Sequence, residues 1–186
     1  ETAPRDLERL ETRIGENAFE INTNITSVTI QSSVKEICDM AFYGCSKLKT
    51  LKLSKGLVSI GNTAFESCTA LTNITFPSTL KTIDAYAFCY CSSLQEIVIP
   101  CSVTSIGRLA FYYCTNLESI TVPTTLTSIH NDRVFSNCDK LKEVHISDLE
   151  AWCNIPFPNN TSNPLYYAKN LYLGNNKITD LVIPIA

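Results

Sequence analysis

The sequence predicts a solenoid, a right-handed superhelix in which one short structural unit is stacked on itself. Cysteine recurs at positions 45, 68, 91, 114 and 138, which are spacings of 23, 23, 23 and 24 residues. Each of these cysteines lies in a phrase close to Ala-Phe-x-x-Cys-x-x-Leu-x-x-Ile-x-Ile. A fixed period of this kind is the signature of a repeat array, so function is to be sought on an extended surface.

The length of the period indicates the type of repeat. Five units have 23 residues each, and the sixth carries one extra residue before Phe135. Units of about 20 to 29 residues with regularly placed Leu and Ile are leucine-rich repeats, whereas ankyrin and tetratricopeptide units are longer. The sequence therefore predicts leucine-rich repeats, which span residues 14–36, 37–59, 60–82, 83–105, 106–128 and 129–146.

Each unit contains one short strand. The segment Ile97-Val98-Ile99 alternates between buried and exposed positions, which is the period of a strand with one buried face. It ends at Pro100, which cannot donate to a ladder and belongs at a strand end. Because so short a strand cannot fold back on itself, it must pair with the same strand of the next unit. The result is a parallel β-sheet on one face, with strands roughly 4.8 Å apart.

The remaining arc of each unit, such as residues 83–91, is too short for an amphipathic helix of several turns. We expect one or two turns of 3₁₀- or α-helix there, on the face opposite the sheet. The phenylalanine of each arc should point inward and stack on the next one. These residues are Phe19, Phe42, Phe65, Phe88, Phe111 and Phe135.

The five periodic cysteines are predicted to be a buried column of small hydrophobic side chains. Stacked coils bring their Cα atoms close enough for disulfides, but side chains in register point the same way, which disfavours the bond geometry. A line of thiols also does not converge on a point, so neither a metal nor another cofactor is expected. Cys38, Cys89 and Cys101 fall at variable positions and are predicted to be exposed. An intermolecular disulfide through Cys101 or Cys38 is left open.

The two ends depart from the period. Residues 1–13 are predicted to be an N-terminal cap with a short helix from Asp6, or a segment foreign to the array. Residues 147–186 are predicted to be a variant repeat and a truncated last repeat, part of a longer parent array. Within them we expect a helical turn after Asp148 or Ser147 and short strands at residues 171–173 and 181–184. No run of apolar residues is long enough to span a membrane.

Phrases such as Ile-Gly-x-x-Ala-Phe-x-x-Cys-x-x-Leu-x-x-Ile-x-x-Pro, at residues 60–77 and 106–123, resemble the BspA-like leucine-rich repeats, also called Treponema pallidum-type repeats. The resemblance covers residues 14–184. It implies an extracellular or cell-surface protein of gut or oral bacteria, or of mucosal protozoa, that takes part in adhesion to host matrix proteins and cells. It implies no catalytic residue, because the family pattern marks scaffold positions only.

Two faces are candidate binding surfaces for a protein or glycoprotein ligand. The first is the outward face of the sheet, where two columns of mostly small polar side chains favour weak, multivalent contact. The second is the opposite arc, where tyrosines precede the periodic cysteines; these rings could instead only cover the phenylalanine stack. The sheet columns are Ser27, Thr50, Asn73, Glu96, Ser119 and Glu143, then Thr29, Lys52, Thr75, Val98, Thr121 and His145. The tyrosines are Tyr43, Tyr90, Tyr112 and Tyr113.

Other function classes have weaker support in the sequence. The best catalytic constellation is Cys153 with His145 and either Asp148 or Glu150, but a core thiol and a surface imidazole explain the same residues, so no enzyme is predicted. Nucleic acid is not an expected partner, because the net charge is −3 and no Lys/Arg stripe is visible. A monomeric adhesion module is the favoured interpretation. The alternative is a structural spacer or targeting array attached to a catalytic domain beyond these 186 residues.

Overall fold

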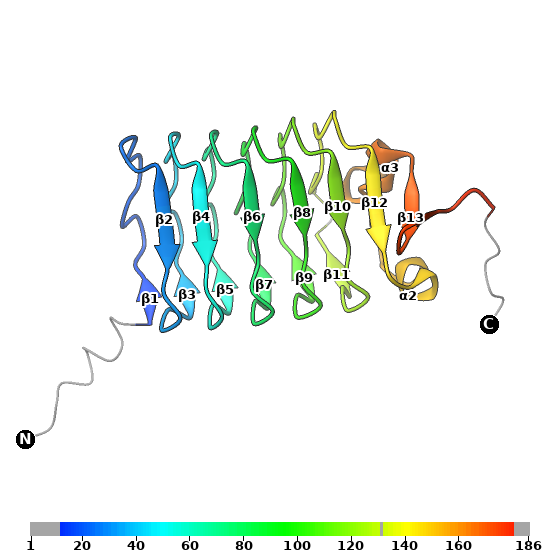
Figure 1. Cartoon of the computed structure of the whole chain (residues 1–186), viewed down its shortest axis with the longest axis horizontal. Helices are drawn as coiled ribbons and strands as arrows, with labels where there is room; N and C mark the ends of the chain where they lie inside the picture. Colours follow the sequence, from blue (N-terminus) through cyan, green and yellow to red (C-terminus); the bar gives the residue numbers. More distant parts are fainter. Residues whose placement is uncertain (1–11, 131, 181–186) are drawn as a thin grey trace, which may run out of the picture.

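The computed structural model describes residues 12–130 and 132–180, and it confirms the leucine-rich repeat solenoid (Figure 1). The predicted sheet runs along one face and has eight strands in the order β14-β13-β12-β10-β8-β6-β4-β2. All its pairs are parallel and join equivalent residues of successive coils, except the antiparallel pair β13–β14. The strands are β2 (Ser27–Ile30), β4 (Thr50–Leu53), β6 (Asn73–Thr75), β8 (Glu96–Val98), β10 (Ser119–Thr121), β12 (Glu143–Ile146), β13 (Leu171–Leu173) and β14 (Asn176–Lys177).

A second parallel sheet, absent from the sequence-based prediction, lies near the lower edge of the array in Figure 1. Each coil contributes two residues to it, and the second of them is an isoleucine, buried in all but the first coil. The order is β1-β3-β5-β7-β9-β11, so these strands also pair one coil with the next. They are β1 (Arg13–Ile14), β3 (Glu36–Ile37), β5 (Ser59–Ile60), β7 (Thr82–Ile83), β9 (Ser105–Ile106) and β11 (Ser128–Ile129).

The arc opposite the long strands is not helical, so the expectation of 3₁₀ or α turns is wrong for the described part of the six units. Alternate backbone N–H groups of the arc donate to carbonyls of the next coil, as from Phe42 to Ala64 at 2.8 Å and from Phe65 to Ala87 at 2.9 Å. A helix would direct these donors along its own axis, whereas stacking offers them a partner at every repeat. The arc therefore forms hydrogen-bonded turns that join the coils.

These turns require left-handed backbone at two positions in every coil. In the fourth coil the positions are Tyr86 and Tyr90, with φ of 56° and 59°, and only Gly44 supplies a glycine at any of the twelve equivalent sites. Each such residue other than glycine costs about 1–2 kcal/mol relative to right-handed backbone. The hydrogen bonds to the next coil hold this conformation, so they offset the strain energy that glycine would otherwise avoid.

The predicted phenylalanine stack forms the core of the array. Neighbouring rings are nearly parallel, with interplanar angles of 3° to 10° and centroids 5.0 to 5.8 Å apart. Five of the six rings are fully buried. Phe19, in the first coil, stacks on Phe42 yet remains 41% exposed.

The five periodic cysteines are buried and free, as predicted, and they also make a specific bond. Each thiol donates to the carbonyl of the phenylalanine in the preceding coil, with Sγ–O distances of 3.2 to 3.4 Å. For Cys91 the acceptor is Phe65, whose carbonyl also accepts the N–H of Cys68 at 3.2 Å. Cysteine therefore suits this position because it is small, apolar and able to donate one bond to the neighbouring coil.

Burial keeps these thiols protonated. Burial raises the pKa of Cys91 and Cys114 well above the ordinary value and that of Cys138 to about 12. A thiolate there would lie in an apolar core without a compensating cation. The column is thus a structural element and not a nucleophile.

Two of the three cysteines predicted to be exposed are buried. Cys38 is 3% exposed and Cys89 is 1% exposed, whereas Cys101 is exposed as expected. The stack of coils explains Cys38, since equivalent positions in the coils on either side are Gly15 and Gly61, and the Arg13 guanidinium donates to its thiol at 2.8 Å. For Cys89, burial and then the Glu66 carboxyl raise the pKa to about 12.

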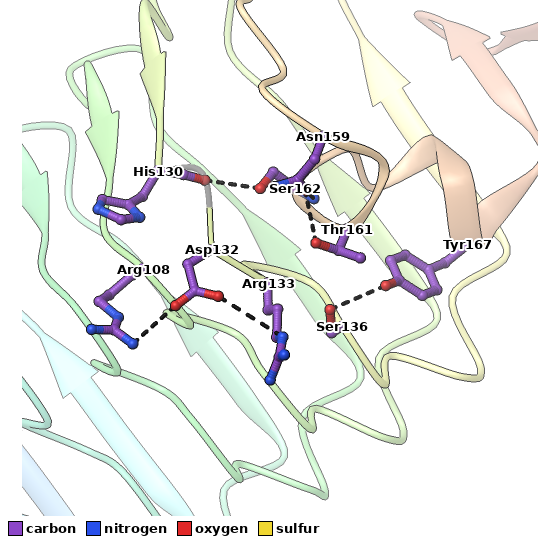
Figure 2. A network of polar contacts seen from close by, with 9 residues as sticks. All are labelled: Arg108, His130, Asp132, Arg133, Ser136, Asn159, Thr161, Ser162 and Tyr167. Atoms are coloured by element: carbon purple, nitrogen blue, oxygen red, sulfur yellow. Dashed lines mark hydrogen bonds and ion pairs between the residues drawn. The ribbon is translucent and has the colours of Figure 1, made fainter.

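The irregular sixth unit returns to register within one residue. His130 N–H donates to Ile106 as in the regular coils, and Leu109 N–H donates to Asp132, one residue later than the regular spacing. The one-residue shift is therefore already complete at Asp132. His130 and Asp132 are each held by a polar contact: Arg108 pairs with Asp132 at 2.9 Å, and Ser162 Oγ donates to the His130 carbonyl at 2.8 Å (Figure 2).

The variant unit forms a seventh coil on this frame. Asp148 caps α2 (Leu149–Cys153), as predicted, by accepting from Ala151 N–H at 2.8 Å. The 3₁₀-helix η1 (Asn160–Ser162) and α3 (Leu165–Ala168) then lead into β13, which pairs with β12 and confirms the strand expected at residues 171–173. The helix expected from Asp6 and the strand expected at residues 181–184 lie outside the described residues.

Glycine recurs in alternate coils at positions 15, 61 and 107, and packing requires it at the last two. A Cβ at Gly107 would lie 2.4 Å from the backbone nitrogen of Ala85, whereas a Cβ at Gly15 would meet nothing within 4 Å. We predict that Gly107→Ala lowers the free energy of unfolding by about 1–3 kcal/mol through overpacking. Gly15→Ala is the matched control and should leave it within about 0.5 kcal/mol. Equal denaturation midpoints for the two variants would contradict this packing.

The protonated column predicts a pH dependence. Between the ordinary thiol pKa of 9.0 and about 12 the unfolded chain binds fewer protons than the folded one, so the free energy of unfolding should fall as pH rises through this window. Below pH 9 the contribution of these thiols to the free energy of unfolding stays constant.

Burial of the column also predicts which cysteines react. At about pH 8, alkylation of the native protein followed by peptide mass spectrometry should find Cys101 and Cys153, which are exposed, modified and the column intact. Rapid modification of Cys91 in the folded protein would contradict the burial of the cysteine column.

Candidate functional site

The outward face of the long sheet carries both predicted columns in register. Backbone pairing aligns the first column from Thr50 through Asn73, Glu96 and Ser119 to Glu143. In the second column Lys52 is aligned with Thr75, and Val98 with Thr121 and His145. Side chains of both columns are exposed on β2 to β8 and half-buried on β10 and β12.

The ladder of this sheet is interrupted between β6 and β8. These two strands share one register pair, Asn73 with Glu96, whereas β4 with β6 and β8 with β10 share three pairs each. In later coils Ile99 N–H donates to Thr121 and Val122 N–H to His145. Within the described chain, no equivalent backbone bond leaves residue 76. The two coils therefore separate at the ends of these strands.

Phe76 explains the separation. It takes the position that the half-buried Leu53 and the buried Ile99 and Val122 occupy in other coils. Its ring packs edge-on against Phe88, with centroids 5.5 Å apart at 71°. A ring at this position needs more room between coils than an aliphatic side chain does. We attribute the open ladder to this one residue, which the sequence analysis did not single out.

A depression of about 410 Å³ lies on the sheet face at this point. Its apolar residues are two from the core, the half-buried Pro100 and Val98, which is 50% exposed. Its polar residues come from the first column and Thr75. An apolar floor with a polar rim suits one apolar side chain of a partner, oriented by polar contacts. The lining residues are Asn73, Ile74, Thr75, Phe76, Glu96, Val98 and Pro100.

The C-terminal end of the sheet carries a second group of contacts, which the columns drawn from the sequence lacked. Tyr172 extends the second column and stacks on His145, with ring centroids 4.8 Å apart. Glu143 accepts from the Tyr172 hydroxyl at 3.4 Å, and its other oxygen lies 3.1 Å from His145 Nε2. The partial burial of Glu143 and His145 follows from these contacts.

The arc face gathers three of its four predicted tyrosines. The rings of Tyr90, Tyr112 and Tyr113 lie within 4.7 to 5.7 Å of one another, and Tyr90 and Tyr113 are exposed. Tyr43 lies three coils from Tyr112 at the equivalent position, with Glu66 and Cys89 between them. Because the rings touch, the cluster encloses no space for a ligand and offers only its outer surface.

The candidate catalytic residues are not assembled into a site. His145 contacts Glu143 and Tyr172, and among the described residues no hydrogen bond joins it to Cys153. Cys153 is exposed on α2, which corrects the expectation of a core thiol. Within residues 12–130 and 132–180, no group of three His, Cys, Asp or Glu side chains is placed to hold a metal ion. Among the helices of those ranges, none has the length and apolar character of a membrane span.

Comparison with solved structures agrees with this architecture. The chain is similar to a leucine-rich cell surface protein from Faecalibacterium prausnitzii A2-165, with 35% identity and a TM-score of 0.66 over 70% of this chain and 35% of that one. The T. pallidum leucine-rich repeat protein TpLRR is 29% identical, with a TM-score of 0.70 over 88% of this chain and 79% of that one.

A third similar structure is the pneumococcal vaccine antigen PcpA, with 26% identity and a TM-score of 0.61 over 73% of this chain and 33% of that one. The chain thus spans about a third of the length of the F. prausnitzii and pneumococcal proteins. A comparison with proteins of curated function yields no match. The family model of the BspA type leucine-rich repeat region matches residues 12–142 in six copies. With the stacked coils, this match shows that the chain belongs to the BspA-type leucine-rich repeat family.

Proposed function

We propose that this protein is a non-enzymatic adhesion module that presents its sheet face to a host or bacterial protein or glycoprotein. It acts at the cell surface or outside the cell. This location is supported by the F. prausnitzii relative, which is a cell surface protein, and by the pneumococcal one, which is a vaccine antigen. The fold itself is typical of protein-interaction scaffolds, because stacked coils offer a long continuous surface.

The depression between β6 and β8 is the observation that carries this proposal. Val98 is the only large apolar side chain of the twelve in the two columns, and among the described residues it stands beside the one interruption in the parallel ladder of this sheet. Binding energy concentrates where an apolar group is desolvated in a preformed recess, with polar contacts around it. The other column residues add polar contacts of lower individual affinity.

The tyrosine cluster supports a second binding face of the same module. Tyr90 and Tyr113 hold left-handed backbone, where a glycine or an asparagine would be less strained, and their rings are held by mutual packing. Rigid, exposed tyrosines lose little entropy on binding a partner. A ligand could therefore be engaged on both faces by neighbouring copies on a cell surface.

A spacer or targeting array is the second candidate function. The observation that favours it is the length of two relatives, of which this chain covers 35% and 33%. In such a protein the solenoid would hold another domain away from the surface. Binding by the isolated solenoid separates the two candidates, since a spacer needs no ligand of its own.

Replacement of Val98 tests the sheet face. We predict that Val98→Asp weakens binding to immobilised matrix and mucosal glycoproteins (collagen, laminin, fibronectin and mucin) by about tenfold or more, or about 1.4 kcal/mol. Surface plasmon resonance would measure it. Thr29→Asp is the matched control, since it adds the same charge to the same column in the first coil. No binding by the wild-type chain, or equal loss in both variants, would refute the proposal.

Replacement of Phe76 tests the origin of the depression. Phe76→Leu should let β6 and β8 pair fully, so that the backbone N–H of residue 76 donates to the Val98 carbonyl and exchanges more slowly with solvent. Amide hydrogen exchange measures this protection. The cost to stability should stay near 1 kcal/mol, because the swap keeps an apolar side chain. Unchanged exchange at residue 76 would show that another constraint opens the ladder.

A further inference from the structure

The sheet side of the first three coils has an unusual charge distribution. Residues 21–35, 46–58 and 69–82, which form this side, contain six lysines and no aspartate or glutamate. The acidic side chains of the same coils lie elsewhere, as Glu16, Glu20, Asp39 and Glu66 do on the arc side. The lysines are Lys35, Lys47, Lys49, Lys52, Lys55 and Lys81. A chain with a net charge of −3 thus carries one strongly basic face.

These lysines are exposed and unpaired. All six side chains are exposed, and none takes part in an ion pair in the described part of the chain. The acidic residue next to Lys35 in the sequence is Glu36, which lies 3.9 Å from Arg13 Nε. Lys142 at the other end of the sheet differs, because it pairs with Glu118 at 3.1 Å. The positive potential of the first coils is therefore not neutralised by neighbouring carboxylates.

The lysines are arranged in two directions. Lys49 precedes β4, Lys52 lies on its outward face and Lys55 lies in the turn that follows it, so the three cross the sheet in one coil. Along extended backbone, residues three apart have Cα atoms about 10 Å apart. Lys35 and Lys81 hold equivalent positions two coils apart, with Val58 between them, and backbone bonds of 2.7 Å join each pair of neighbours. A band across the second coil thus meets a row along the edge of the array.

The type of charge indicates the type of partner. Every cation in the band is an ammonium, which acts as a point charge on a flexible stem and lacks the planar fork with which arginine contacts phosphate or bases. Phe76, the aromatic ring on this side of the three coils, is buried, so bases would find no ring to stack on. Well-spaced ammonium groups on an open face suit sulfate or carboxylate groups repeated along a flexible polymer.

We propose that this basic face binds a linear anionic polysaccharide through Lys49, Lys52 and Lys55, with Lys35 and Lys81 extending the site along the edge. No Lys/Arg stripe is visible in the sequence because the lysines do not recur at the repeat period; they gather within one coil and its neighbours. The site adjoins the depression, since Lys52 is aligned with Thr75 of its lining, but none of these lysines is itself a lining residue. A chain without a protein ligand can therefore still bind the polysaccharide.

The test uses the intact chain and a heparin-derived oligosaccharide as the probe, in isothermal titration at low and physiological salt. We expect the triple variant Lys49→Glu, Lys52→Glu and Lys55→Glu to weaken binding by more than tenfold. In a plot of the logarithm of the association constant against the logarithm of salt concentration, the slope should become less steep by about two to three. The reason is that each lysine contact that is lost means about one fewer counterion released on binding. The control replaces Lys140, Lys142 and Lys177 by Glu, which makes the same change in net charge, and should lose less than about threefold.

Three outcomes would overturn the proposal. One is no heparin binding by the wild-type chain at low salt. Another is an equal loss in both triple variants, which would show that only net charge matters. The last is tighter binding of single-stranded DNA or polyglutamate than of heparin at equal charge, which would assign the face to a different polyanion. Thermal unfolding of both variants must match that of the wild type, and single Lys→Gln substitutions replace the triple variant if it does not fold.

Discussion

Hydrogen bonds from each coil to the next are the interaction on which the whole structure depends. They join the long strands, the short strands and the arc, where Phe42 and Phe65 donate to the coil that follows. No coil satisfies its backbone alone, so each is folded only while its neighbour is. The same bonds hold Tyr86 and Tyr90 in left-handed backbone, which their side chains would otherwise disfavour. Stability is therefore a property of neighbouring pairs of coils.

This stacking aligns every position of the repeat into a column, and each column has its own physical requirement. The phenylalanine and cysteine columns are uniform, since a ring must stack and a thiol must donate to the coil before it. Gly107 is required because the backbone of Ala85 lies against it. Departures from uniformity are then informative. Phe76 opens the sheet, and the lysines around Lys52 make one face basic, although neither change is needed for stacking.

Much of the fold could be predicted from the period, because an in-register solenoid repeats its core. The long sheet, the phenylalanine stack and the buried cysteine column follow from the spacing alone. The arc could not be predicted, since local propensity favours helical turns there and only the neighbouring coil supplies the competing acceptors. Burial of Cys38 was missed for the same reason, as it depends on glycines one coil away. The sheet columns were placed correctly, but the depression requires knowledge of where two coils separate.

The amino-acid sequence by itself determined the number of coils, the residues that fill the core and the family, because these depend on spacing within one chain. The tertiary structure alone decided which side chains meet across coils. It opened the ladder at Phe76 beside Val98, stacked Tyr172 on His145 and gathered Lys35, Lys55 and Lys81 on one edge. The physical reason is that residues 23 apart become neighbours only after stacking, so contacts between variable positions are absent from any single repeat.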